Sequence, residues 1–131
     1  MTWQVQITPQ VEQWLQSLGA KDRQHVAQAL DRLADVGPTL GTPLVKRIKS
    51  SRHHNMKELR YGNYRALFAF DPRQRAVVLA AGDKTGDWRG WYERNIPIAD
   101  RLYDRHLRSI GGGDHQWKAQ RAGVRSAANS R

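Results

Sequence analysis

The sequence contains no cysteine, so the chain can form neither a disulfide nor a thiolate metal site. This absence is compatible with a reducing compartment. Long apolar runs are also missing: none approaches the ~18 residues that a transmembrane helix needs, and the opening MTWQVQ lacks the features of a secretory signal. We therefore expect a cytoplasmic protein with no membrane partner. The length of 131 residues predicts one small globular domain.

Acidic residues are scarce as well. The chain has 12 Asp and Glu against 22 Lys and Arg, which gives a net charge of +10. Residues 46–65 hold seven bases and one acid, and residues 111–131 hold four bases and one acid, so the remainder is nearly neutral. A concentrated basic band in nearly neutral surroundings favours a polyanionic partner, most often nucleic acid. The alternative is a solvated basic face that keeps the protein soluble.

The spacing of apolar residues predicts an α+β fold. Residues 3–7 alternate between apolar and polar side chains, as in a strand. Two helices are expected next, one opened by Thr8 and Pro9 and ended by Gly19, the other over about residues 21–35. Further strands are predicted over residues 44–48, 56–61, 64–70 and 76–81. This order predicts an N-terminal strand and a two-helix hairpin, with the helices on one face of an antiparallel sheet of about four to five strands.

The C-terminal part is expected to add one helix. A polar loop over residues 82–87 precedes it, and Asn95 and Pro97 are suited to cap and start it. Its apolar stripe would consist of Ile98, Leu102, Leu107 and Ile110. Three consecutive glycines from Gly111 end the pattern. We therefore expect the globular domain to span residues 1–110 and residues 111–131 to form a flexible basic tail.

The basic band supplies candidates for contact with phosphate groups. Arg52, Lys57, Arg60 and Arg65 are interleaved with aromatic residues, a pattern usual for proteins that bind single-stranded RNA. Guanidinium groups match phosphate oxygens bidentately, which favours the arginines in particular. The alternative for any one of them is a surface ion pair.

His53 and His54 are candidates for proton transfer. Adjacent residues of an extended chain point to opposite sides, so one of the two can face the basic band and act as a general acid or base near neutral pH. The alternative is a hydrogen-bonded loop residue. A metal site is disfavoured because the nearest carboxylate is Glu58 and the spacing of known histidine metal motifs is absent. The sequence indicates no cofactor.

A second cluster follows the last predicted strand and contains Lys84, Trp88, Trp91 and Tyr92. Trp88 is expected to pack against the sheet. Tyr92 or Trp91 would instead present a ring on which an RNA base stacks. Paired carboxylates, a serine–histidine arrangement and a phosphate-binding glycine loop are not apparent in the sequence.

Two long strings resemble a known family. They are HHNMKELRYGNYRALFAFD, over residues 53–71, and AGDKTGDWRGWYERNIPIADRLYDRHL, over residues 81–107. Together with the predicted order of elements they resemble the phage-derived HigB branch of the RelE/ParE superfamily, the toxins of bacterial type II toxin–antitoxin systems. The resemblance covers residues 3 to about 109. It implies a compact domain of the microbial ribonuclease type that cleaves mRNA on the translating ribosome, without a metal and with the RNA 2′-hydroxyl as nucleophile.

The resemblance also implies roles for individual residues. Arg65 is expected to stabilise the charged transition state. Lys84 is expected to contact the phosphate or the leaving group, and Tyr92, with Trp91 as its competitor, to stack on a base or assist proton transfer. The sequence departs from the family at Glu58, next to Lys57, where lysines are common. The general base therefore remains open between His54, His53 and Glu58.

The partners implied by the resemblance are a cognate antitoxin with a helix-turn-helix DNA-binding domain, mRNA and the ribosome. Operator DNA would be reached only through the antitoxin. Two other functions stay open at this point: a ParE-like toxin that inhibits DNA gyrase without cutting RNA, and a plain nucleic-acid-binding module. The histidines together with Arg65, Lys84 and Tyr92 favour the nuclease.

Overall fold

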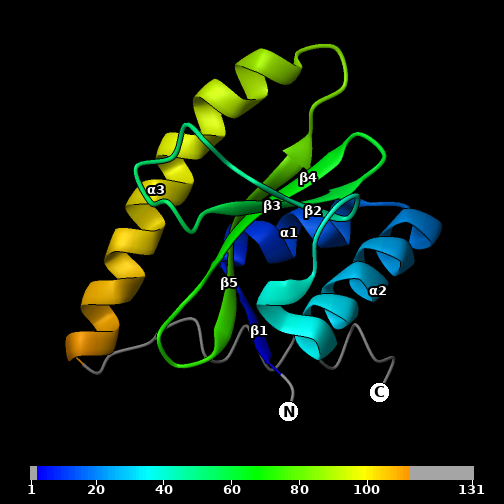
Figure 1. Ribbon diagram of the computed structural model, residues 1–131. Helices are drawn as coiled ribbons and strands as arrows, with labels where there is room; N and C mark the ends of the chain where they lie inside the picture. The colour runs from blue at the N-terminus through cyan, green and yellow to red at the C-terminus, as the bar shows by residue number, and fades with distance from the viewer. Residues whose placement is uncertain (1–2, 113–131) are drawn as a thin grey trace.

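The computed structural model describes residues 3–112 and confirms the predicted α+β class (Figure 1). Its elements in chain order are β1 (Gln4–Ile7), α1 (Pro9–Ser17), α2 (Ala20–Val36), the short 3-10 helix η1 (Gly37–Thr39), β2 (Val45–Arg47), β3 (Lys57–Tyr61), β4 (Tyr64–Phe70), β5 (Arg75–Asp83) and α3 (Trp88–Gly112). The helix start at Thr8 is as expected, because its hydroxyl accepts a hydrogen bond from the backbone N–H of Val11 at 3.3 Å.

The five strands form one sheet in the order β1-β5-β4-β3-β2. Strands β2, β3, β4 and β5 pair antiparallel, as expected. Strand β1 differs, because it pairs in parallel with β5. The chain leaves β1 through the α1–α2 hairpin and returns through the meander, a long connection that permits parallel pairing.

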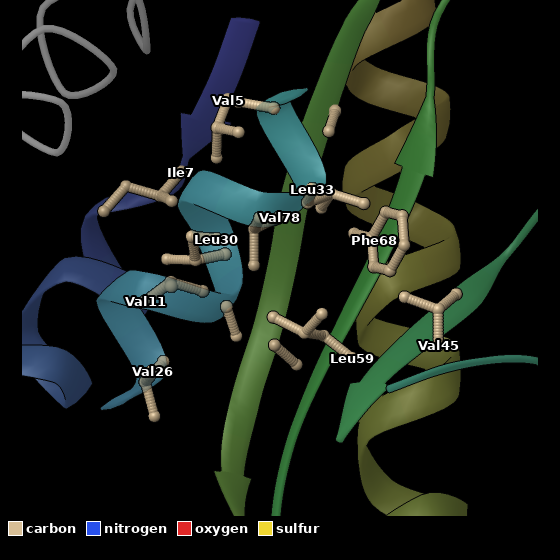
Figure 2. Packing of buried hydrophobic residues seen from close by; sticks show 14 of the residues in the cluster. Val5, Ile7, Val11, Val26, Leu30, Leu33, Val45, Leu59, Phe68 and Val78 are labelled. Atoms are coloured by element: carbon tan, nitrogen blue, oxygen red, sulfur yellow. The ribbon is translucent and has the colours of Figure 1, made fainter. Parts of the chain in front are cut away.

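One hydrophobic core lies between the sheet and the helices α1 and α2. Val26, Leu30 and Leu33 recur at helical spacing along α2 and are almost fully buried. Figure 2 shows the side chains of α2 facing Phe68 and Val78 of the sheet. Because these side chains come from alternate positions of the strands, the intervening positions point to the other face of the sheet.

Helices α1 and α2 lie on one face of the sheet, as predicted, and helix α3 covers the other face (Figures 1 and 2). A second core joins the sheet to α3. It consists of Ile48, Met56, Leu67, Ala69, Val77, Leu79, Ala80, Trp91, Ile96, Ala99 and Tyr103.

Helix α3 begins at Trp88, seven residues before the predicted start at Asn95, and Pro97 lies inside it. Its buried side also differs from the predicted stripe. Ile98 is 38% exposed, whereas Tyr103 and His106 are buried. Leu102 and Leu107 of the predicted stripe do pack, partly buried, against the second core, but the buried side of α3 also includes a polar residue, His106, that an apolar pattern omits. Gly111 and Gly112 extend the helix, and the rest of the predicted tail, 113–131, lies outside the described residues. No helix within residues 3–112 is long and apolar enough to cross a membrane.

A buried ionic cluster connects the β4–β5 turn to α3. The carboxylate of Asp71 accepts hydrogen bonds from Arg75 Nε at 2.8 Å and lies 2.7 Å from His106 Nε2. Its other oxygen accepts bonds from the backbone N–H groups of Arg73 and Arg75. Burial alone would raise the pKa of Asp71, but the hydrogen bonds from His106 and Arg75 outweigh it and lower that pKa below its ordinary value.

The cluster generates a prediction for Asp71→Asn. The substitution leaves the Arg75 guanidinium buried without its charge partner, so the free energy of unfolding at neutral pH should fall by about 3–5 kcal/mol. Because the folded-state pKa of Asp71 is lowered, the carboxylate contributes stability above its ordinary pKa and loses it as pH falls through the folded value. The difference in unfolding free energy between the wild-type protein and Asp71→Asn should therefore become smaller below about pH 4. Denaturant unfolding between pH 3 and pH 7 measures it.

The matched control is Asp35→Asn, an exposed position on α2. It should change stability by no more than about 0.5 kcal/mol. An Asp71→Asn protein as stable as this control would show that the cluster does not hold the turn to the helix.

Candidate functional site

An open groove of about 610 Å³ lies where the start of α3 meets the edge of the sheet formed by β2, β3 and β4. Six of its lining residues are basic, and Glu58 is the single acid among them. The basic residues are Lys46, Arg47, Lys49, Arg60, Arg65 and Lys84. Five of the seven bases of the basic band are therefore gathered, together with Lys84, into one concave surface, which suits a polyanion.

The pleat of the sheet places the charged side chains together. Glu58 and Arg60 alternate along β3 with Leu59, which faces the α1–α2 core. Arg60 lies directly opposite Arg65 on β4, and Lys46 on β2 lies opposite Glu58. Two like charges are thus paired across neighbouring strands, an arrangement that is unfavourable unless an anion lies between or above them.

Arg65, Tyr92 and Glu58 form a hydrogen-bonded chain in the groove. Arg65 Nε donates to the Tyr92 hydroxyl at 3.1 Å, and that hydroxyl donates to Glu58 Oε1 at 2.5 Å. Arg65 Nε also lies 3.5 Å from Glu58 Oε1. Arg65 and Glu58 are each only 6% exposed, so the chain joins a charge pair in a poorly solvated position to a residue of α3.

The guanidinium of Arg65 is held from two sides. Its Nη1 donates to the backbone carbonyls of Gly62 at 2.7 Å and Tyr64 at 2.8 Å, while Nε is taken by Tyr92. Gly62 has φ 56° in the β3–β4 turn, a conformation that suits glycine. The two N–H groups of Nη2 have no partner within residues 3–112. Arg65 therefore offers one nitrogen to a ligand, and the two-nitrogen fork assumed from the sequence is not available.

The hydroxyl of Tyr92 stays protonated at neutral pH. Burial raises the pKa of Tyr92, the hydrogen bond to the Glu58 carboxylate raises it further, and the bond from Arg65 opposes the shift. A neutral hydroxyl holds a proton that it can donate, whereas the ionised carboxylate beside it can accept one. The arrangement thus contains an acceptor, Glu58, a donor, Tyr92, and a fixed positive charge, Arg65.

The structure brings some of the predicted site residues to this groove and not others. Lys84 and Arg60 line it together with Arg65 and Tyr92. Lys57 points to the opposite face, where its Nζ donates to the carbonyl of Pro38 at 3.2 Å and lies 5.5 Å from the ring of Phe70. Lys57 is therefore turned away from the other candidates.

The two histidines are separated from the groove. His53 Nε2 lies 2.6 Å from Asp104 Oδ1 of α3, and Arg52 pairs with the same carboxylate. His54 is exposed in the turn before β3 and does not line the groove. Of the three candidates for the general base, Glu58 is the one that the fold places beside Arg65.

The environments of the two tryptophans are the reverse of those predicted: Trp91 is buried and Trp88 is exposed. Trp91 is 5% exposed and packs in the second core, where its ring lies so close to Gly82 that a Cβ on Gly82 would meet the indole Nε1 at 2.6 Å. It cannot present a ring to RNA from there. Trp88, expected to pack on the sheet, is 57% exposed. The helix start assumed at Asn95 hid this difference, because it left both residues in a loop.

Sequence reasoning missed Lys46, Arg47 and Lys49 as parts of the site. They were counted in the net charge, but the short strand β2 and its register with β3 were needed to place them at the groove. Within the described residues, no group of three or more His, Asp or Glu side chains is arranged to hold a metal ion.

Comparison with known proteins agrees with this fold. The family described as "Phage derived protein Gp49-like (DUF891)" matches residues 13–104. A Mycobacterium tuberculosis protein named "Putative toxin HigB3" is 47% identical over 109 residues, which covers 82% of this chain and 96% of that protein. "Putative toxin HigB2" of the same organism is 44% identical over 102 residues, or 74% of this chain and 51% of that protein, about half its length.

Solved structures share the fold at low sequence identity. The archaeal RelE–RelB complex from Pyrococcus horikoshii matches with a TM-score of 0.55 and 21% identity, over 66% of this chain and 99% of that one. The toxin–antitoxin complex RelBE2 from Mycobacterium tuberculosis matches with a TM-score of 0.51 and 20% identity, over 63% and 99%. The fold is thus that of RelE toxins. The chain belongs to the Gp49-like family and is a HigB-like toxin, as the resemblance predicted.

The hydrogen-bonded chain generates a prediction for Tyr92→Phe. Loss of the hydroxyl removes the donor to Glu58 and the acceptor of the hydrogen bond from Arg65 Nε. The free energy of unfolding should therefore fall by about 1–3 kcal/mol. Tyr61→Phe is the matched control, because the Tyr61 hydroxyl bonds to His25 at 2.9 Å outside the groove. It should cost less, about 1 kcal/mol or below. Equal stability losses in denaturant unfolding would contradict a special role for the Tyr92 hydroxyl in the groove.

Proposed function

We propose that this toxin is a metal-independent endoribonuclease that cuts mRNA in the cytoplasm on the translating ribosome. The observation that carries the proposal is the chain of Arg65, Tyr92 and Glu58 inside a groove lined by six basic residues. The basic lining suits the phosphate backbone of RNA. The chain supplies a proton acceptor, a proton donor and a fixed positive charge, which together are sufficient for internal cleavage of RNA.

In the proposed reaction the 2′-hydroxyl of the RNA attacks the adjacent phosphorus. Glu58 takes the proton of that hydroxyl, and the oxygen–phosphorus bond to the next nucleotide breaks. The departing 5′-oxygen takes a proton from Lys84 or from Tyr92, whose hydroxyl is neutral at working pH. The products are a 2′,3′-cyclic phosphate and a 5′-hydroxyl. Glu58 fills the role of general base because it is the candidate acceptor beside Arg65, whereas His53 is bound to Asp104 and His54 lies outside the groove.

Arg65 acts on the charge of the transition state. The phosphorane-like intermediate carries more negative charge than the phosphodiester, so a cation fixed in advance favours it over the substrate. The three hydrogen bonds from Nε and Nη1 fix the guanidinium, and Nη2 is the nitrogen that reaches the phosphate. Lys84, held at the rim by the bond from its backbone N–H to the carbonyl of Asn63 at 3.0 Å, contributes a second positive charge.

The proposal includes a cognate antitoxin. The structural relatives named above are complexes of RelE with RelB or of RelBE2, which supports a protein partner for this toxin as well. A partner segment with acidic side chains would be complementary to the groove and would associate quickly. We propose that the antitoxin carries a helix-turn-helix domain and that operator DNA is bound through it.

The first test identifies the RNA ends. Addition of the purified toxin to a translating extract should stop protein synthesis and yield mRNA fragments with 5′-hydroxyl ends and cyclic phosphate ends. The ends are read by sequencing of ligated fragments before and after treatment with a 5′-kinase. If protein synthesis continues and DNA supercoiling collapses instead, the toxin is a gyrase inhibitor and the proposal is wrong.

The second test concerns Arg65. Arg65→Ala should lower the cleavage rate at least about 100-fold, the size of loss expected when a fixed transition-state donor is removed. Arg65→Lys should recover only part of the rate. It restores the positive charge, but an ammonium group cannot make the three hydrogen bonds that fix the guanidinium. Antitoxin binding, measured by co-purification, should survive both changes.

Lys57→Ala is the matched control, since Lys57 points to the opposite face of the sheet. It removes the same charge and should leave the rate within about twofold, because the ammonium group lies on the opposite face of the sheet, where solvent screens its charge. An Arg65→Ala protein that remains folded and cuts at the wild-type rate would remove Arg65 from the site.

A further inference from the structure

A second open depression adjoins the groove on its α3 side. Its volume is about 480 Å³, and it shares Trp88, Tyr92 and Ile96 with the groove. A strand of RNA whose phosphate lies at Arg65 would therefore continue past Tyr92 and over Trp88 into this depression. The proposed reaction leaves it without a role.

Trp88 is unusual because it is a large apolar side chain left in solvent at the first position of α3. It is 57% exposed, whereas Trp91, one turn further along the helix, is buried. Its ring meets Tyr92 edge to face, with the two centroids 6.4 Å apart, and the guanidinium of Arg89 lies 5.8 Å from its centroid. The neighbours thus restrain the indole without enclosing it. An exposed flat ring of this kind suits stacking with a nucleobase.

Glu93 supplies a hydrogen-bond acceptor in the same depression. It is exposed and has no partner within residues 3–112. The other carboxylate there, Asp100, is engaged, because its oxygens accept bonds from Ser51 Oγ at 2.5 Å and from the backbone N–H of Arg52 at 3.3 Å. A free carboxylate accepts hydrogen bonds from amino groups and repels carbonyl oxygens. It would favour a base with an exocyclic amino group over uracil, whose ring N–H donor lies between two carbonyl oxygens.

We propose that this depression is a base-binding subsite for a nucleotide next to the cut phosphate, in which Trp88 stacks on the base and Glu93 accepts a hydrogen bond from its amino group. The inference rests on the proposed action on RNA and adds a source of base preference to it. Trp88 and Glu93 act in binding, and neither touches the reacting atoms.

The test measures binding without cleavage. In an Arg65→Ala background, fluorescence anisotropy gives the Kd for labelled hexamers of adenylate and of uridylate. Adenylate should bind more tightly than uridylate. Adding Trp88→Ala should weaken adenylate binding about 5- to 100-fold, the range found when one stacking ring is removed. Trp88→Phe should restore most of the affinity, because it keeps a ring.

Glu93→Gln is read as the ratio of the two Kd values, since loss of a negative charge strengthens all RNA binding. The substitution should bring the Kd for uridylate, divided by the Kd for adenylate, close to one. Arg101→Ala is the control: this arginine is exposed on α3 and lines neither depression, so its variant should keep both the ratio and the tight binding of adenylate. Unchanged adenylate binding in Trp88→Ala, or an unchanged ratio in Glu93→Gln, overturns the inference.

Cleavage by the otherwise wild-type protein separates this inference from the proposed function. If the toxin cuts mRNA and Trp88→Ala cuts at the same positions with the same efficiency, the subsite is wrong and the nuclease stands. If the toxin binds adenylate through Trp88 but leaves mRNA intact, the nuclease is wrong and the subsite stands.

Discussion

The contact of Arg65 with Tyr92 and Glu58 is the interaction on which the site depends. It joins β3 and β4 to the start of α3 through a charge pair that is almost completely withdrawn from water. Such a pair is costly unless each group has its hydrogen bonds, and Tyr92 and the carbonyls of the β3–β4 turn provide them. The turn, the two strands and the helix must therefore all be in place before the groove has its charge distribution.

The two faces of the sheet differ in what they contribute: one holds a hydrophobic core, and the other also lines the groove. One face packs against α1 and α2 in a close-packed hydrophobic core, where a change in the volume or the polarity of a side chain lowers stability. The other face is apolar under the middle of α3 and charged beyond it, where β2, β3 and β4 extend past the buried residues. The same alternation of side chains along β3 and β4 that builds the first core thus presents the charged residues to the groove.

Local patterns were sufficient for the strands, the helical hairpin and the α+β class, because each of these rests on periodicity or on capping residues such as Thr8. They failed where long-range packing decides. The start of α3 and the places of Trp88 and Trp91 depend on which side of the helix the sheet covers. The candidates Arg65, Arg60, Lys84 and Tyr92 come together as expected. Lys57 shares the face of Leu59, two residues further along β3, and therefore points away from them, which a grouping of basic residues by charge alone overlooks. The assembly of Glu58 with Arg65 likewise needed the pairing of β3 with β4.

The opposition of Arg60 and Arg65 across β3 and β4 has a consequence for the free protein. The groove stores electrostatic repulsion, since six cations converge on it and Glu58 alone offsets them. Any anionic occupant, whether a nucleic acid or an acidic polypeptide, relieves this repulsion and so shifts the balance between folded and unfolded chains towards the folded form. Inhibition and folding are then coupled: an inhibitor that fills the groove with negative charge also stabilises the folded form of the toxin that it silences.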